Sequence, residues 1–166
     1  MVYVINCENQ PLMPCKPVIA RLLLKQGKAR VTKRTPFTIK LLYETTNYTQ
    51  ELILGVDTGS SKIGSAVVDI NGNVLYTSEV EIRNDIANKM TRRAKYRRNR
   101  RNRKTRYRKP RFLNRKNSIK KDRFSPTMVS KINSHLKEIN FVKSILPISR
   151  LILETATFDP HALKNP

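Results

Sequence analysis

"ELILGVDTGSSKIGSAVVDINGNVLY", residues 51–76, decides the fold, because it carries three strand-like segments in close succession. Residues 52–57 form an apolar run rich in branched side chains, and residues 62–70 form a second one, which predicts two strands. Residues 74–82 alternate apolar and polar side chains, as a half-buried strand does. Asn71 followed by Gly72 is a strong hairpin signal between the last two segments. The stretch therefore predicts a three-stranded antiparallel meander, with its first strand central in a larger sheet.

Asp57 ends the first predicted strand and is followed by Thr58, Gly59 and two serines. Three interpretations of this turn stay open. A carboxylate at a strand end can ligate a metal ion, and a turn rich in glycine and hydroxyls can hold phosphate through its amides. Asp before Thr-Gly also commonly caps its own turn, which is a purely structural role. For Glu154, which ends the apolar segment 151–154, the structural alternative is a surface acid at a strand end.

Asp57 and Glu154 each follow an apolar strand of similar composition, LILGVD and LILE. If these strands are parallel neighbours, both carboxylates lie at the same carboxyl-end edge, where open α/β sheets place their sites. Two acids brought together repel unless a cation lies between them, and Mg²⁺ or Mn²⁺ prefers oxygen ligands. Two-metal phosphodiester hydrolysis uses such a cluster. The pair therefore predicts a metal site with Asp57 and Glu154 as candidate ligands and catalytic residues.

The whole chain is strongly basic, with 34 Lys and Arg against 12 Asp and Glu in 166 residues, a formal net charge of +22. This excess predicts a polyanionic partner, and nucleic acid fits better than a membrane because no apolar stretch reaches the roughly 18 residues of a spanning helix. The first residues lack a signal-peptide pattern. The 2 cysteines and 2 histidines form no closely spaced zinc set. We expect a soluble cytoplasmic protein with no membrane partner and no obligate homo-oligomer.

More than half of the basic side chains lie between Lys89 and Arg123, where 19 of 35 residues are Lys or Arg. No proline occurs before Pro110, and Arg, Lys and Ala form helices well, so we expect one helix from about residue 85 to residue 109. Basic side chains cover every side of it, which favours nucleic-acid phosphates as its partner. The alternative is a disordered basic tail. The candidate contacts here are Arg92, Arg93, Arg97, Arg98, Arg100, Arg101, Lys104 and Arg108.

The segments before and after this run have ordinary globular character. Before it, the pattern predicts a small β-α-β module with a helix that ends near Gly27, and the proline-rich stretch at 11–17 is predicted to be extended without joining any regular element. After it, Ser125 and Pro126 open a helix with one apolar face, followed by a strand at 151–154. The predicted parts are residues 1–48, 49–84, 85–123 and 124–166.

Four motifs, in this order along the chain, resemble the IscB and IsrB family of transposon-encoded, RNA-guided DNA endonucleases. They are PLMP at residues 11–14, GVDTGSSKIGSAVVD, the arginine-rich run and LETATFD. The resemblance identifies the four parts as a PLMP domain, RuvC segment I, a bridge helix with a basic linker, and a helix with a truncated RuvC segment II. It implies an α/β fold with a ribonuclease H-like (RuvC) mixed sheet that this chain leaves incomplete.

The resemblance implies that Asp57 and Glu154 are two of the RuvC carboxylates that bind Mg²⁺ or Mn²⁺, in a protein of the prokaryotic cytosol. It implies a guide (omega) RNA and a DNA target as partners, and the PLMP domain resembles a part that contacts structured RNA. Family members continue into a third RuvC segment and, in IscB proteins, an HNH domain. We therefore expect an N-terminal fragment with an incomplete metal site, and a C-terminal half as a further candidate partner. The basic residues of the PLMP domain that suit RNA are Lys28, Arg30, Lys33 and Arg34.

Two alternatives to an endonuclease stay open. A fragment of this kind can retain the RNA contacts and lack catalysis, which makes it an RNA-binding protein. DTGSSKIGSAVVD also resembles the first phosphate-binding hairpin of the sugar kinase, actin and heat-shock ATPase superfamily, which shares the ribonuclease H-like topology. Proteins of that superfamily do not carry a long arginine helix directly after the third strand, which makes a phosphotransferase the less favoured alternative.

Overall fold

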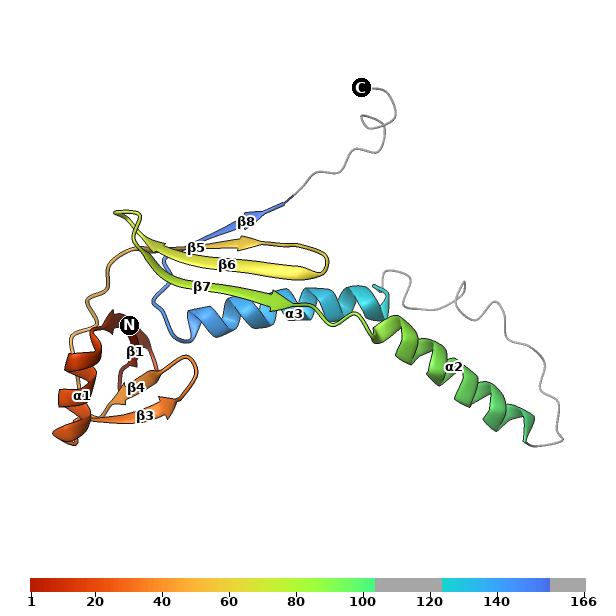
Figure 1. Cartoon of the computed structure of the whole chain (residues 1–166), viewed down its shortest axis with the longest axis horizontal. Coiled ribbons are helices and arrows are strands. Elements are labelled where there is room, and N and C mark those ends of the chain that lie inside the picture. The colour runs from red at the N-terminus through yellow and green to blue at the C-terminus, as the bar shows by residue number, and fades with distance from the viewer. Residues whose placement is uncertain (104–123, 156–166) are drawn as a thin grey trace, which may run out of the picture. The chain divides into compact units, whose positions relative to one another are not determined.

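The computed structural model describes residues 1–103 and 124–155 (Figure 1). These residues belong to two compact units, one made of Met1–Glu81 with the chain from His135 onward, and the other made of Ile82–Ser134. The first unit contains two four-stranded sheets, each with parallel and antiparallel pairs, so the predicted α/β fold is confirmed. The predicted helical segment 104–109 lies outside the described residues.

The N-terminal sheet has the strand order β2-β1-β4-β3, with β1 and β4 parallel at its centre. A single helix, α1, connects β2 to β3 and ends just before Gly27, whose φ of 68° is a left-handed conformation that glycine adopts without strain. The side chain of Ala20 on α1 is buried against the sheet residues Val4 and Ile39 in one apolar core. The elements are β1 (Val2–Ile5), β2 (Pro11–Cys15), α1 (Pro17–Lys25), β3 (Ala29–Lys33) and β4 (Thr38–Leu41).

The proline-rich stretch forms strand β2, so the prediction that it joins no regular element is wrong. β2 pairs with β1 at the edge of the sheet, with Leu12 opposite Val4 and Cys15 opposite Val2. Pro14 lies where the register shifts between these two pairs. Proline is tolerated at an edge or a bulge because no second neighbour needs its missing N–H group. Two strands therefore precede α1 in the sequence and two follow it, whereas the predicted β-α-β module has one before the helix and one after it.

The second sheet has the order β7-β6-β5-β8 and contains the predicted meander. β5, β6 and β7 are antiparallel neighbours, and β8 pairs with β5 in parallel. Gly72 has a φ of 83° in the turn between β6 and β7, as its place in the predicted hairpin requires. The strands are β5 (Leu52–Asp57), β6 (Lys62–Asp69), β7 (Val74–Glu81) and β8 (Arg150–Glu154).

From His135 onward, helix α3 (Pro126–Lys143) runs along one face of this sheet (Figure 1). Its start matches the prediction, because the backbone N–H of Met128 donates to the Ser125 side-chain oxygen at 3.3 Å. The predicted apolar face is buried only in part: Ile139 and Val142 are buried, whereas the earlier apolar side chains of the face are at least 39% exposed. Sheet residues such as Leu52, Leu54, Ile63 and Val67 are fully buried on the helix side.

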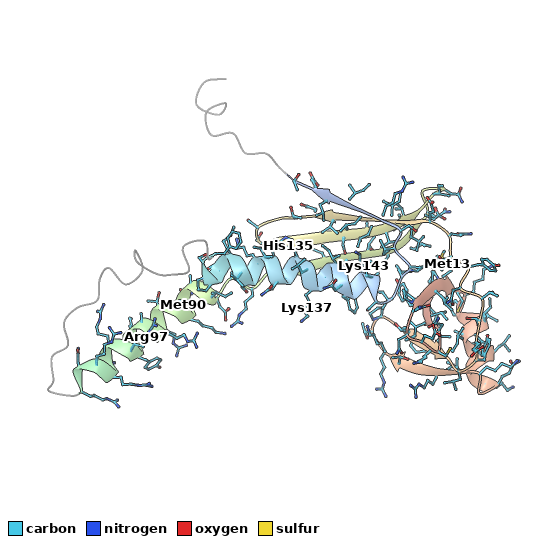
Figure 2. All side chains as sticks on the ribbon, turned by 180° about the vertical axis from the view of Figure 1, so that it is seen from behind. Met13, Met90, Arg97, His135, Lys137 and Lys143 are labelled. Carbon is cyan, nitrogen blue, oxygen red and sulfur yellow. The ribbon has the colours of Figure 1, made fainter. Side chains whose placement is uncertain are left out.

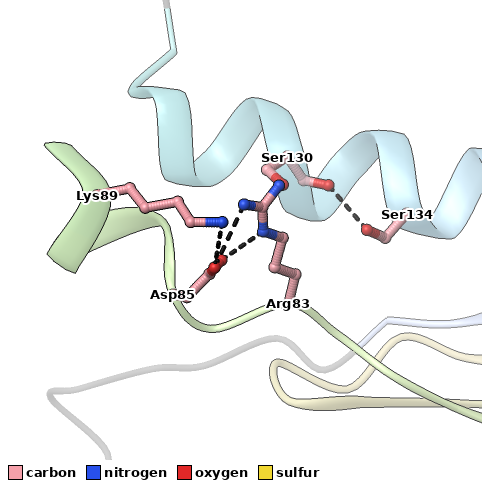
Figure 3. A network of polar contacts seen from close by, with 5 residues as sticks. All are labelled: Arg83, Asp85, Lys89, Ser130 and Ser134. Carbon is pink, nitrogen blue, oxygen red and sulfur yellow. Dashed lines mark hydrogen bonds and ion pairs between the residues drawn. The ribbon is translucent and has the colours of Figure 1, made fainter.

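The second unit contains α2 (Ile86–Asn102), which begins where the sequence predicted a basic helix, and the first turns of α3. None of the α2 side chains is buried. Just before α2, the Asp85 carboxylate accepts hydrogen bonds from the Arg83 guanidinium and forms an ion pair with Lys89 at 2.6 Å (Figure 3). An acid at this end of the helix complements the partial positive charge of the first exposed N–H groups.

Candidate metal centre and nucleic-acid interface

The two candidate metal ligands are brought together by strand pairing. β5 and β8 run parallel and in register, with Asp57 opposite Glu154 at their carboxyl ends. Neighbouring strands lie about 4.8 Å apart, and residues directly opposite one another project from the same face of the sheet. Both side chains are exposed. The condition set in the sequence analysis, that the two strands are parallel neighbours, is therefore met, and the pairing places two carboxylates side by side on one face.

This face is the one opposite α3. Along β5, Leu54 and Val56 are buried in alternation with the exposed Asp57, so the carboxylate projects away from the helix-covered core. Gly64 on β6 lies opposite Asp57, and a Cβ atom there would lie 3.6 Å from the Asp57 Cβ. Because glycine has no side chain, space is left beside the Asp57 carboxylate on the side away from Glu154.

A third acid lies in the same row of residues across the strands, which runs from Glu154 through Asp57 and Gly64. Glu79 on β7 lies opposite Gly64, so Gly64 separates it from Asp57. The Glu79 carboxylate forms an ion pair with Lys62 and thereby raises the pKa of the Lys62 ammonium above its usual value. Glu79 thus already has a cationic partner from its own sheet. Asp69, by contrast, is at the far end of β6, opposite Leu52.

The turn after β5 is shaped by its own backbone. A Cβ atom on Gly59 would lie only 2.3 Å from the Lys62 carbonyl oxygen, so no larger residue fits without a backbone shift. The Thr58 hydroxyl donates to the Glu154 carbonyl oxygen at 2.8 Å. The close backbone approach therefore accounts for the glycine of DTGSS, and the contact with Glu154 accounts for its threonine hydroxyl. Neither residue needs a bound phosphate to account for its presence.

The donor set of the Asp57–Glu154 pair suits a hard cation, because carboxylate oxygens are the ligands that Mg²⁺ and Mn²⁺ prefer. Within residues 1–103 and 124–155, no group of three or more His, Cys, Asp or Glu side chains could hold a metal ion. Two carboxylates fill only part of a six-coordinate Mg²⁺ shell, and the remaining positions are left for water, substrate or further ligands.

The candidate nucleic-acid contacts of α2 are all on the surface of the protein. The helix contains eight Lys or Arg and no acid among its 17 residues, and Figure 2 shows side chains projecting from both edges of its ribbon in that view. Lys104 and Arg108 lie outside the described residues. The six predicted contacts that the structure describes are exposed: Arg92, Arg93, Arg97, Arg98, Arg100 and Arg101.

Among the basic residues of the N-terminal sheet, Lys28, Arg30 and Arg34 are exposed. Lys33 differs, because its ammonium lies 3.3 Å from the Ser144 hydroxyl oxygen and 4.9 Å from the centre of the Phe141 ring. A cation over an aromatic face is attracted by the negative face of the ring. Lys33 therefore links the N-terminal sheet to the end of α3, a role that sequence reasoning missed.

Sequence reasoning also missed a buried carboxylate beneath the second sheet. Glu138 on α3 is only 8% exposed, and its Oε1 accepts hydrogen bonds from Ser78 at 2.6 Å, Ser65 at 3.0 Å and Tyr76 at 3.3 Å. Ser65 and Ser78 are cross-strand partners on β6 and β7. The cluster joins the helix to both strands, on the face opposite Asp57. Its only sequence signal is serine at inward positions of two strands.

Comparison with protein-family models gives one match that spans nearly the whole chain: residues 2–166 match a family described as RRXRR protein. The pattern in that description occurs in α2 as RRNRR, residues 97–101. Comparison with curated proteins gives no match. None of the helices in residues 1–103 and 124–155 combines the length and apolar character needed to cross a membrane.

Proposed function

Because the chain belongs to the RRXRR family, which is associated with IscB and OrfB proteins, we propose that it is a guide-RNA-binding part of an RNA-guided DNA endonuclease. In this proposal it corresponds to the N-terminal part of the enzyme. It supplies two carboxylates to a RuvC-type metal centre and a basic helix to the guide RNA. The observation that carries the proposal is the register of β5 with β8, which pairs Asp57 with Glu154.

In the proposed site, Asp57 and Glu154 hold Mg²⁺ or Mn²⁺ on the open face of the sheet. The ion supplies charge neutralisation for a phosphodiester and activation of water. The residues of the chain keep the two carboxylates in place: the β5–β8 ladder fixes their backbones, and Thr58 joins the turn to the end of β8. Gly64 leaves space beside Asp57, where a bulky DNA backbone can approach.

The proposed role of α2 follows from its charge. A helix without an acid or a buried side chain has little to gain from packing and much to gain from neutralisation by phosphates. Arginine suits RNA because its planar fork meets phosphate oxygens in pairs and its face stacks on bases. In RNA-guided effectors the protein holds the RNA by its backbone and shape, while base pairing reads the DNA sequence.

The metal centre is tested by Mn²⁺ binding to the purified chain, followed by electron paramagnetic resonance. Asp57→Asn and Glu154→Gln should each weaken binding by about tenfold or more, because each removes one charged ligand. Glu79→Gln is the matched control on the same face, and it should bind Mn²⁺ as the wild type does. Equal Mn²⁺ binding by all four proteins would overturn the assignment. In an intact enzyme, Asp57→Ala should abolish cleavage of one DNA strand while guide RNA binding persists.

The RNA contact is tested by measuring RNA affinity over a range of salt concentrations. Replacing Arg93, Arg97 and Arg101 by Ala should make the negative slope of log affinity against log salt shallower by about 2, since each single-strand phosphate contact contributes about −0.7. The charge control is Lys137→Ala/Lys143→Ala, which removes exposed cations outside α2 and should change the slope little. An unchanged slope in the arginine variant would show that α2 is not the contact.

A further inference from the structure

We propose that Tyr96 on α2 is a stacking platform for an unpaired RNA base, so that this helix binds bases as well as phosphates. The inference rests on the proposed function, because it assigns a ligand to one face of the proposed RNA-binding helix. Tyr96 is the only aromatic residue in α2, and its side chain is 62% exposed. A tyrosine placed for packing would bury its ring, and this one does not.

The surroundings of Tyr96 form one continuous face of the helix. An open hollow of about 470 Å³ lies along this face, lined among the described residues by Met90, Arg93, Tyr96, Arg97 and Arg100. Residues three, four and seven apart in a helix lie on the same side, which is the spacing of this set. Figure 2 labels Met90 and Arg97, two members of the set, on α2.

This face combines cationic guanidinium groups with an aromatic ring and a thioether, and together they suit a whole nucleotide. Phosphates bind to the arginine guanidinium groups, but the face of a phenol ring carries negative potential and does not attract an anion. A flat nucleobase does stack on such a ring, and Met90 offers an apolar thioether beside it. Arg93 and Arg97 can then neutralise the phosphates on either side of the stacked base, or stack on it themselves.

The base must be unpaired. In an A-form RNA duplex the bases are already stacked on each other, and the deep major groove does not admit side chains. A loop, bulge or single-stranded segment exposes the base face that an aromatic ring needs. Stacking on one ring discriminates little between the four bases, so this contact would add affinity without sequence preference.

The test compares two oligomers of the same length and charge: a 12-residue adenine RNA, and a 12-residue abasic oligomer with the same ribose-phosphate backbone. The full wild-type chain should bind the adenine oligomer about tenfold more tightly than the abasic one. Tyr96→Phe should keep this ratio because it keeps the ring. Tyr96→Leu should bring the ratio close to one, with no change in the salt slope, because no charge is lost.

Lys95→Ala is the control for charge, because at 3.6 residues per turn position 95 lies on the side of α2 opposite the set that lines the hollow. It should weaken the binding of both oligomers by the same factor and leave their ratio unchanged. Circular dichroism of the Tyr96→Leu protein checks that helix content is intact. A 2-aminopurine base in the oligomer gives a second readout, since its fluorescence should be quenched by the wild type and much less by Tyr96→Leu.

Three results would overturn the inference. The wild type could bind both oligomers equally, which means that α2 recognises charge alone. The ratio could persist in Tyr96→Leu, which places the stacking residue elsewhere in the chain. In both of these cases RNA binding, and with it the proposed function, stands. Failure of the wild type to bind either oligomer would instead overturn the proposed RNA-binding function together with the stacking site.

Discussion

The Thr58 hydroxyl donates a hydrogen bond to the backbone carbonyl oxygen of Glu154, 2.8 Å away. Thr58 is one residue beyond Asp57, so this contact joins the turn after β5 to Glu154, the last residue of β8 and the other member of the carboxylate pair. β8 pairs with β5 alone among the described strands, so its end is held by few bonds. The side chain of Thr58 therefore helps to fix the position of Glu154 relative to Asp57.

Thr58→Val removes this donor while keeping the branched shape of the side chain. We expect faster amide hydrogen exchange in β8 and loss of about 1 kcal/mol of local stability, the usual contribution of such a bond. Thr58→Ser keeps the hydroxyl and should exchange as slowly as the wild type. Hydrogen exchange followed by NMR measures both, and identical rates in the Val and Ser variants would contradict the role.

Gly59→Ala should destabilise the fold by about 2 kcal/mol, because the new Cβ would collide with the Lys62 carbonyl oxygen and displace the backbone. Gly55→Ala is the matched control, since its Cβ would meet the nearest atom, the Ala66 carbonyl oxygen, at 3.9 Å, an ordinary contact. Urea unfolding of the two variants measures the difference. Equal stability of Gly59→Ala and Gly55→Ala would contradict the steric argument, because it would mean that the turn accommodates a Cβ atom at position 59.

Glu138 should couple energetically to the serine pair above it. Glu138→Gln loses the charge that strengthens three hydrogen bonds, and Ser78→Ala removes the shortest of them. We expect each variant to lose about 1–2 kcal/mol in urea unfolding, and the double variant to lose about 1 kcal/mol less than the sum. Strict additivity in this double-mutant cycle would mean that the two groups stabilise the fold independently.

The cluster of Asp85 with Arg83 and Lys89 makes the stability of the start of α2 depend on pH. Hydrogen bonds from Arg83, and then from Lys89, lower the pKa of the Asp85 carboxyl from 3.8 to about 2. A folded-state pKa below the ordinary value means that the cluster stabilises the start of α2 above about pH 4 and ceases to do so as the pH falls towards 2. Asp85→Asn should abolish this pH dependence of the helix start.

NMR titration of the Asp85 carboxyl carbon measures the pKa directly. Arg83→Gln should raise the pKa towards 3.8 more than Lys89→Gln does, because Arg83 is the larger cause of the shift. The opposite order would assign the main interaction to Lys89.

Much of the second sheet could be predicted from sequence because its signals are local. The apolar run of β5, the Asn71–Gly72 step and the Ser125 cap each act within a few residues, and all three are found as predicted. The Asp57–Glu154 pairing is a long-range contact, and the similar apolar composition of LILGVD and LILE only raised it as a possibility that the register now meets. The exposure of the β8 side chains could not be read from their apolar composition.

What could not be predicted depends on partners distant in the sequence. β2 contains two prolines, and their tolerance follows from an edge position that is fixed only when β1 and β4 pair. Glu138 resembles a solvent-facing helix acid until Ser65 and Ser78, at least 60 residues earlier, supply its donors. Lys33 resembles any other cation of a basic chain until α3 places Phe141 beneath it.

The outer edge of β8 gives this chain a particular behaviour in solution. Its backbone groups on that side pair with no other described strand, and Leu151, Ile152 and Leu153 are 38–59% exposed. Such an edge favours strand-to-strand association, which the mutual repulsion of chains with a net charge of +22 opposes. Added salt screens that repulsion while leaving apolar contact intact. The same salt that releases nucleic acid from this protein should therefore promote its self-association.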